Sequence, residues 1–493
     1  MSGWASRLLR QGSLYAVANL TMKGAGFLLA LIYLNPAYLS QEAFGIWGTL
    51  DAAAKVIVPL LGLGLVTGVL RFWADPELED QREALATTAL AATAGLALAG
   101  GAVMLVGAEW IAAGLLGDEA PPGAAHLVRL VGALVAFRTV TAVPQSLLRI
   151  RERPGVFVVA VGGEMVVLVA GTVYLLVVRG MGLEGVVLAH VAAAGLSALV
   201  LTAGALWTGR AEVRPDLLGK LVRFGLPLAA AGVASLLLNL GDRFLLLRIT
   251  DAATTAVYDW SGRLGSLLYL VVISSFNLAF SVLGVKSLKG DATQTALHQS
   301  VFRHFIVITG FLALGLSLAA FDLTRWISPE PAYLRAETLV APIAAGYLLY
   351  GVYFLMVNVL FVADRTRTVA VLLVGATALN VALNVALIPT LGPMGAALAT
   401  VVSYGALVAF TARTVAREAA TRFDWSILAR VLGLGAALWA LGHLSVDWPL
   451  AARVGWRMLA VALYVPGAVA LGLYRWAEIR EGLARVLVWR RSR

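Results

Sequence analysis

Basic residues occur inside the long apolar stretches of this chain, where charge is rare. Lys23, Lys55 and Arg138 lie near the middle of such stretches, whereas Arg129 and Arg263 lie nearer to one end. Lys23 comes about ten residues into its stretch, which corresponds to roughly 15 Å of helix. A cation at this depth in a membrane is costly unless it faces water or a partner.

These five cations predict a cavity that binds an anion. Ammonium and guanidinium groups form strong charge-assisted hydrogen bonds with phosphate. Several such groups at successive depths in the membrane would therefore suit a phosphate-bearing substrate. The alternative for each residue is a cation that packs within the helix bundle or extends its charged end to the interface.

Two acidic residues precede bases by one helical turn. Asp51 comes four residues before Lys55, and Asp259 comes four residues before Arg263. Side chains at this spacing share one helix face, so each acid can neutralise its base. Each pair is either a gate, opened when an anion competes for the base, or a structural ion pair that makes burial tolerable.

Two further polar residues lie within apolar stretches. Glu164 has no partner that the sequence identifies, and His190 follows in the next stretch. Carboxylate and imidazole groups at such depth serve proton relays in some transporters, so Glu164 above all is a candidate for coupling. The alternative for both is an ordinary hydrogen bond between helices.

The composition places these residues in a membrane protein. Of 493 residues, 60% are hydrophobic and only 13% are charged, and the mean hydropathy is +0.86. Soluble globular proteins are about half apolar and a quarter charged. The lack of cysteine excludes disulfides and thiolate metal sites. The net charge of +10 comes from bases near the ends of apolar stretches, which predicts topology signals and contacts with anionic lipids rather than nucleic-acid binding.

Fourteen stretches are long enough to cross a bilayer, which needs about 20 apolar residues per helix. They lie at 13–33, 43–69, 86–107, 124–147, 155–178, 183–207, 224–247, 256–284, 301–321, 337–362, 369–389, 393–412, 427–445 and 455–474. Most basic residues between them fall in alternate loops, and the positive-inside rule then places both termini in the cytoplasm. The sequence therefore predicts an all-α polytopic membrane protein.

The chain also repeats itself. GLEGVVLAHVAAAG at 182–195 and GPMGAALATVVSYG at 392–405 each open an apolar stretch, and the segments that begin at Arg10 and Arg223 match at a similar offset. The alternative is that Gly- and Ala-rich membrane helices simply look alike. A repeat after six spans predicts two six-helix lobes in parallel orientation, followed by two more helices. The predicted parts are 1–210 (helices 1–6), 211–222 (cytoplasmic linker), 223–414 (helices 7–12), 415–475 (helices 13–14) and 476–493 (basic cytoplasmic tail).

Several segments carry a family resemblance. RFGLPLAAAGVASLLLNLGDRFLLL, at 223–247, contains Gly225-Leu226-Pro227 and Asp242-Arg243-Phe244, and AFGIWGTL begins at Ala43. With the two Gly-x-x-Gly openings, these segments resemble the polysaccharide and lipid-linked oligosaccharide flippases (O-antigen flippase-like) of the multidrug/oligosaccharidyl-lipid/polysaccharide (MOP) exporter superfamily. The resemblance covers roughly residues 10–415.

The resemblance implies a MATE-like fold and a flippase function. The implied substrate is an undecaprenyl-pyrophosphate-linked oligosaccharide, moved by alternating access from the cytoplasmic to the outer leaflet of the bacterial inner membrane during cell-surface polysaccharide biosynthesis. Membrane lipids and polysaccharide assembly proteins, such as a glycan polymerase, are the implied partners. A MATE-type drug or cation antiporter is the alternative within this fold; the excess of bases over acids at mid-membrane depth disfavours it.

No enzymatic motif accompanies the charges. The sequence has no Walker-type loop, no His-Glu-x-x-His and no Asp-rich run. The longest predicted external loops, at 108–123 and 322–336, are short and predicted to lack regular structure, whereas a glycan polymerase or ligase needs a sizeable external loop. We therefore expect no enzyme activity, no cofactor and no metal. Transport would be driven by an ion gradient, the membrane potential or consumption of the product, and a non-transporting scaffold is the remaining alternative.

Overall fold

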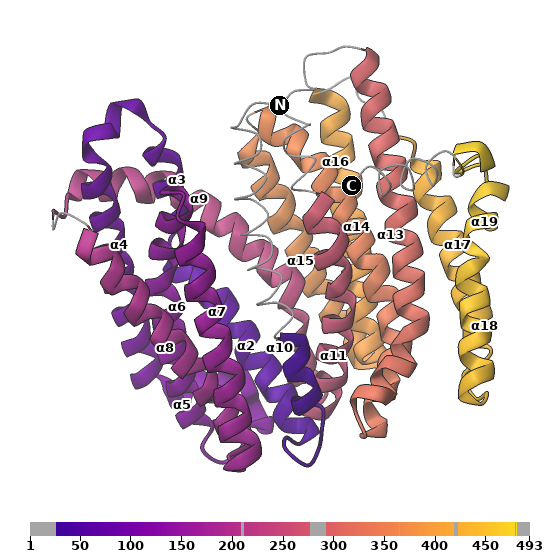
Figure 1. The fold of residues 1–493 in the computed structure, drawn as a ribbon, viewed down its shortest axis with the longest axis horizontal. Coiled ribbons are helices and arrows are strands. Elements are labelled where there is room, and N and C mark those ends of the chain that lie inside the picture. The colour runs from indigo at the N-terminus through magenta and orange to yellow at the C-terminus, as the bar shows by residue number, and fades with distance from the viewer. Residues whose placement is uncertain are drawn as a thin grey trace. The chain divides into compact units, whose positions relative to one another are not determined.

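The protein is built from helices. The computed structural model describes residues 26–208, 212–276, 292–363, 365–418, 423–478 and 480, and these residues form helices but no β-strand (Figure 1). Eleven helical segments within this part of the chain are long and apolar enough to cross a membrane. The predicted class, an all-α polytopic membrane protein, is confirmed.

Three of the predicted spans fall on shorter or partly described helices. Residues 26–33 are helical, and the remainder of the first span, including Lys23, lies outside the described residues. Helix α11 (Ala252–Leu268) has 17 residues, and the last span is divided between α18 (Leu450–Ala462) and α19 (Tyr464–Ala470). The total of fourteen spans therefore stays a prediction.

The helices group into two compact units. The first comprises residues 1–259, 327–332 and 370–396. Its helices are α2 (Gln41–Leu61), α3 (Leu65–Trp73), α4 (Arg82–Val106), α5 (Ala108–Leu116), α6 (Ala124–Ile150), α7 (Pro154–Thr172), α8 (Gly182–Thr208), α9 (Pro215–Leu240), α10 (Asp242–Ile249) and most of α15 (Thr366–Leu391). Thr377 on α15 donates a hydrogen bond to the carbonyl of Ala234 on α9, at 2.8 Å.

The second unit comprises residues 260–326, 333–369 and 397–493. It contains most of α11, the π-helical turn η4 (Tyr269–Ile273), α13 (Ala292–Ile327), α14 (Ala336–Val362), most of α16 (Pro393–Glu418), α17 (Trp425–His443), α18 and α19. The predicted division into two six-helix lobes stays a prediction.

Local sequence sets where several helices begin. Ser40 precedes α2 and accepts a hydrogen bond from the backbone N–H of Ala43, and Asp424 caps α17 in the same way through Ser426. Pro154 and Pro215 occupy the first positions of α7 and α9, where the missing N–H has no helical partner to lose.

Two of the sequence-based expectations about loops are wrong. Residues 108–123 were expected to lack regular structure, but they contain α5 and the 3₁₀ turn η2 (Gly117–Glu119). In the other loop, α13 continues to Ile327, and a 3₁₀ turn, η5 (Pro331–Arg335), follows. Prolines in both loops favoured irregular structure. The residues before those prolines are apolar enough to form helix, as α5 in the first loop and as the end of α13 in the second. The predicted linker 211–222 is also helical from Pro215 onward.

A glycine turn divides the second predicted span. Leu63 and Gly64, between α2 and α3, have φ angles of 45° and 70°. A Cβ on Gly64 would lie 2.1 Å from the carbonyl oxygen of Gly225 on α9. Glycine suits this position because it tolerates the left-handed backbone and leaves room for the neighbouring chain. This contact gives a physical reason for the glycine in Gly225-Leu226-Pro227.

Replacing Gly225 with alanine is expected to destabilise the first unit. A Cβ there would lie 2.5 Å from the carbonyl oxygen of Gly64, so α3 and α9 must move apart. Overpacking of this kind costs about 1–3 kcal/mol. The measurement is the unfolding temperature of the detergent-purified protein, with Gly232→Ala on the same helix as control, since a Cβ there meets nothing within 4 Å. Equal unfolding temperatures for the two variants would contradict the account.

Candidate anion-binding site

Helix α2 carries an acid and a base one turn apart. The Nζ of Lys55 donates a hydrogen bond to Oδ2 of Asp51 at 2.5 Å. Asp51 lies in the buried part of the helix, residues 44–54, and is only 8% exposed, whereas the Lys55 side chain is half exposed. Lys55 thus reaches from a buried carboxylate to an accessible position, where its remaining N–H donors can meet a ligand.

A second cation approaches the same carboxylate from another helix. Arg138 lies on α6, which packs against α2, and its Nη1 is 3.7 Å from Oδ1 of Asp51. The Arg138 side chain is partly exposed. Two bases around one acid leave the group of Asp51, Lys55 and Arg138 with a net positive charge, which favours an anionic ligand.

Further polar groups lie beside this cluster. The ring of His190 on α8 lies 4.5 Å from the ring of Trp47, and its Nδ1 is 2.9 Å from the carbonyl oxygen of Val186. Asp51, Lys55 and Arg138 all act electrostatically on His190, and the charge of Arg138 also acts on Glu164 of α7. The sequence did not single out Trp47, because its contact with His190 arises only when α2 packs against α8.

The other predicted site residues lie elsewhere. Arg129 approaches Glu109 at 3.9 Å, and both side chains are exposed. Arg263 lies on α11 in the second unit, and Lys23 is outside the described residues. The structure therefore brings together Lys55, Arg138 and Asp51, with Glu164 nearby, and the role of each stays a prediction.

Asp259 has a partner that sequence spacing did not indicate. The Nε of Arg243 donates to Oδ1 of Asp259 at 2.7 Å, and the same guanidinium lies 3.2 Å from Asp242. The hydroxyl of Tyr258 donates to Asp242 as well. All four residues are buried. Asp259 therefore belongs to a buried network centred on Arg243, and its predicted pairing with Arg263 stays a prediction.

The chemistry that the cluster supports is reversible anion binding. Lys55 and Arg138 offer N–H donors, and Asp51 holds both cations in place when no ligand is bound. Within the described residues, no group of three or more His, Cys, Asp and Glu side chains is arranged to hold a metal ion. A phosphate that approaches Lys55 would replace its ion pair with Asp51 by charge-assisted hydrogen bonds to the phosphate oxygens.

The sequence matches a known family. The profile of the family described as polysaccharide biosynthesis protein matches residues 38–327, which is more than half of the chain. Among curated proteins, none matches the sequence.

Solved structures share the fold at low sequence identity. A structure of the lipid II flippase MurJ in an inward-closed conformation is 13% identical, covering 92% of this chain and 98% of its own, with a TM-score of 0.73. An inward-facing multidrug resistance MATE family transporter of the MOP superfamily is 14% identical, covering 81% of this chain and 95% of its own, with a TM-score of 0.60. A MOP superfamily transporter from Pyrococcus furiosus is also 14% identical, with 83% and 96% covered and a TM-score of 0.53. The predicted MATE-like fold is confirmed.

Proposed function

We propose, from the premise that the chain belongs to the family of polysaccharide biosynthesis proteins, that it is a flippase for a lipid-linked oligosaccharide. The substrate class is an oligosaccharide on undecaprenyl pyrophosphate, moved from the cytoplasmic to the outer leaflet of the bacterial inner membrane. One observation carries the proposal. Asp51, Lys55 and Arg138 form a net positive cluster within spans that cross the membrane, and a pyrophosphate needs such a group on its path.

The cluster suggests how substrate is bound and released. In the absence of substrate, Asp51 pairs with Lys55 and Arg138. Pyrophosphate, with several acceptor oxygens, competes with Asp51 for these cations when the site faces the cytoplasm. After the site has opened to the outer side, Asp51 re-forms its pairs and favours release. The prenyl tail stays in the lipid throughout, so only the polar headgroup requires a path.

The distribution of basic residues supports the proposed orientation in the membrane, and the family supports the proposed partners. Both termini lie in the cytoplasm, and membrane lipids and polysaccharide assembly proteins, such as a glycan polymerase, are the expected partners. The alternative within the same fold is a drug or cation antiporter, which the similarity to a MATE transporter keeps open.

The test is transport in liposomes that contain the purified full chain. A fluorescent lipid-linked oligosaccharide starts in one leaflet, and its appearance in the other is followed with an impermeant lectin or quencher. We expect flipping at least about tenfold faster than in protein-free liposomes, because the cluster lowers the cost of moving a charged headgroup. A cationic dye in the same liposomes serves as control. Uptake of the dye in exchange for protons, with no flipping of the glycan lipid, would replace the flippase by the antiporter.

A further inference from the structure

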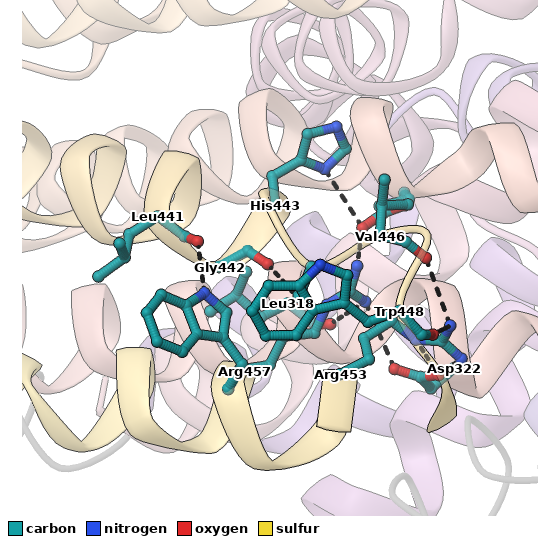
Figure 2. A network of polar contacts seen from close by, with 12 residues as sticks. Leu318, Asp322, Leu441, Gly442, His443, Val446, Trp448, Arg453 and Arg457 are labelled. Carbon is teal, nitrogen blue, oxygen red and sulfur yellow. Dashed lines mark hydrogen bonds and ion pairs between the residues drawn. The ribbon is translucent and has the colours of Figure 1, made fainter. Parts of the chain in front are cut away.

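Buried charges join the last helices of the chain to the rest of the second unit. Figure 2 shows Arg453 and Arg457 of α18 beside Asp322 of α13. Arg453 donates to Oδ1 of Asp322 through Nε at 3.0 Å and through Nη2 at 2.7 Å. Its Nη1 donates to the carbonyls of Val446 and Trp448, in the turn between α17 and α18, at 3.3 and 2.9 Å. Arg453 therefore attaches both α18 and this turn to α13.

Arg457 connects α18 to two helices at once. Its Nη2 donates to Oε1 of Glu337, the second residue of α14, at 2.5 Å. Its Nη1 donates to the carbonyl of Leu318 at 2.9 Å and to Oδ2 of Asp322 at 3.4 Å, and both of these residues lie on α13. Arg457 and Glu337 are each only 4% exposed. One side chain of α18 thus holds the end of α13 beside the beginning of α14.

The charges of this network, rather than apolar packing, hold α18 in place. Arg453 and Arg457 form ion pairs with Asp322 and Glu337, and the imidazole of His443 lies 3.4 Å from Glu337. Moving α18 away would leave these charges without partners in lipid, which is costly. An apolar contact between helices is easier to break in a membrane, because lipid tails are as apolar as the helix they replace.

Polar contacts join the last helices to α13 further along its length. The hydroxyl of Tyr464 on α19 donates to the carbonyl of Val307 at 2.9 Å, and both residues are buried. The guanidinium of Arg303 lies 5.0 Å from the ring centroid of Tyr474, which follows α19. The contacts with α13 run from residue 303 to residue 322, which is about 28 Å of helix. They therefore extend over nearly the whole hydrocarbon core, which is roughly 30 Å thick.

We propose that α17, α18 and α19 form one rigid body with α13, in which the arginines of α18 lock the end of α13 to the beginning of α14. The last helices then move with α13 during transport and never separate from it to open a path. The proposal applies equally to a glycan lipid and to a cation as substrate, because it concerns the motion of this unit.

Disulfides between α13 and α17 test whether these helices must separate. The chain has no cysteine, so an introduced pair supplies the only thiols. A Cβ on Gly310 of α13 would lie 2.4 Å from Cγ1 of Val431 on α17. A Cβ on Gly442 of α17 would lie 2.5 Å from Cδ2 of Leu318. Cysteines at 310 and 431, or at 318 and 442, therefore come as close as a disulfide requires.

Both disulfides are expected to form and to leave transport unchanged. The variants are Gly310→Cys with Val431→Cys, and Gly442→Cys with Leu318→Cys, each in the full chain. Disulfide formation is measured as the loss of free thiols on mild oxidation, and transport is measured in liposomes with the glycan lipid and with the cationic dye. Whichever of these the wild type carries, the oxidised variant should carry at a rate within about twofold of the reduced variant.

Two results with the disulfides would overturn the rigid body. One is a loss of transport on oxidation that a reductant restores, in either variant, because it would show that α13 and α17 must separate. The other is a failure of both pairs to form a disulfide, because the helices would then not stay in contact. Each single-cysteine variant, oxidised in the same way, shows whether oxidation itself affects transport.

Unfolding temperatures test the lock without reference to the substrate. Arg457→Met leaves Glu337 buried without its arginine, and the unfolding temperature of the purified full chain is expected to fall by about 5 °C or more. Adding Glu337→Gln should recover part of this fall, because that acid no longer needs a cation. Arg335→Met, at an exposed arginine directly before α14, is the control and should leave the temperature unchanged. Equal falls in Arg457→Met and Arg335→Met, or a double variant less stable than Arg457→Met, would contradict the lock.

Discussion

Lys55→Ala and Arg138→Ala are each expected to abolish transport while the protein still accumulates in the membrane. Each variant removes one of the two cations that hold a pyrophosphate, and leaves Asp51 with a single partner. Loss of one positioned charge-assisted donor costs about 3 kcal/mol, which corresponds to a fall of about a hundredfold in rate. The same result is expected for Lys23→Ala. The measurement is complementation of a flippase-deficient strain, with membrane abundance checked by blot.

Conservative and distant variants serve as controls. Lys55→Arg is expected to retain part of the activity, because charge matters at this position more than the shape of the side chain. Lys220→Ala, an exposed lysine on α9, is expected to behave as wild type. If Lys55→Ala, Arg138→Ala and Lys23→Ala each complemented normally, the proposal that these cations bind the pyrophosphate would be refuted. The antiporter would then be favoured.

Replacing Asp51, the acid of the cluster, is expected to tighten substrate binding rather than weaken it. Asp51→Asn frees Lys55 and Arg138 from their counter-charge. Binding of the lipid-linked substrate should tighten, whereas turnover should fall, because release requires the original pairs to re-form. Weaker substrate binding with unchanged turnover would show that Asp51 has a purely structural role.

Arg243→Ala is expected to destabilise the first unit strongly. Arg243 is 7% exposed and lies between the carboxylates of Asp242 and Asp259, which are 3% and 4% exposed. Removing it leaves two buried acids without their cation. Loss of one partner from a buried ion pair costs about 3–5 kcal/mol. The expected result is a marked drop in the unfolding temperature of the purified protein, or failure to accumulate in the membrane.

A surface pair and a double variant test this explanation. Arg214 pairs with Asp216 at 2.9 Å, but both side chains are well exposed, so Arg214→Ala should cost no more than about 1 kcal/mol. Arg243→Leu combined with Asp259→Leu should cost less than the sum of the two single changes, because no unpaired charge of that pair remains buried. Additive losses would show that the pair does not stabilise the unit through charge.

Local patterns in the sequence determined the class of protein and the contact within α2. Apolar stretches of about 20 residues have few alternatives to membrane helices, because the backbone must satisfy its own hydrogen bonds in lipid. Asp51 and Lys55 are four residues apart on one helix, so helical geometry alone brings them together, and the structure shows their ion pair. The sequence also marked Gly225 through a family resemblance, without giving the reason for it.

Tertiary packing decided which distant groups meet. Arg138 reaches Asp51 because α6 packs on α2, and Gly225 is required because α9 approaches the turn at Gly64. The same spacing that links Asp51 to Lys55 suggested Arg263 for Asp259, yet Arg243 on the preceding helix donates to that acid. Arg457 donates a hydrogen bond to Glu337, which lies 120 residues earlier in the sequence. Depth along a helix can be counted from sequence, but the direction in which a side chain faces, and the helix it meets, follow from how the helices pack.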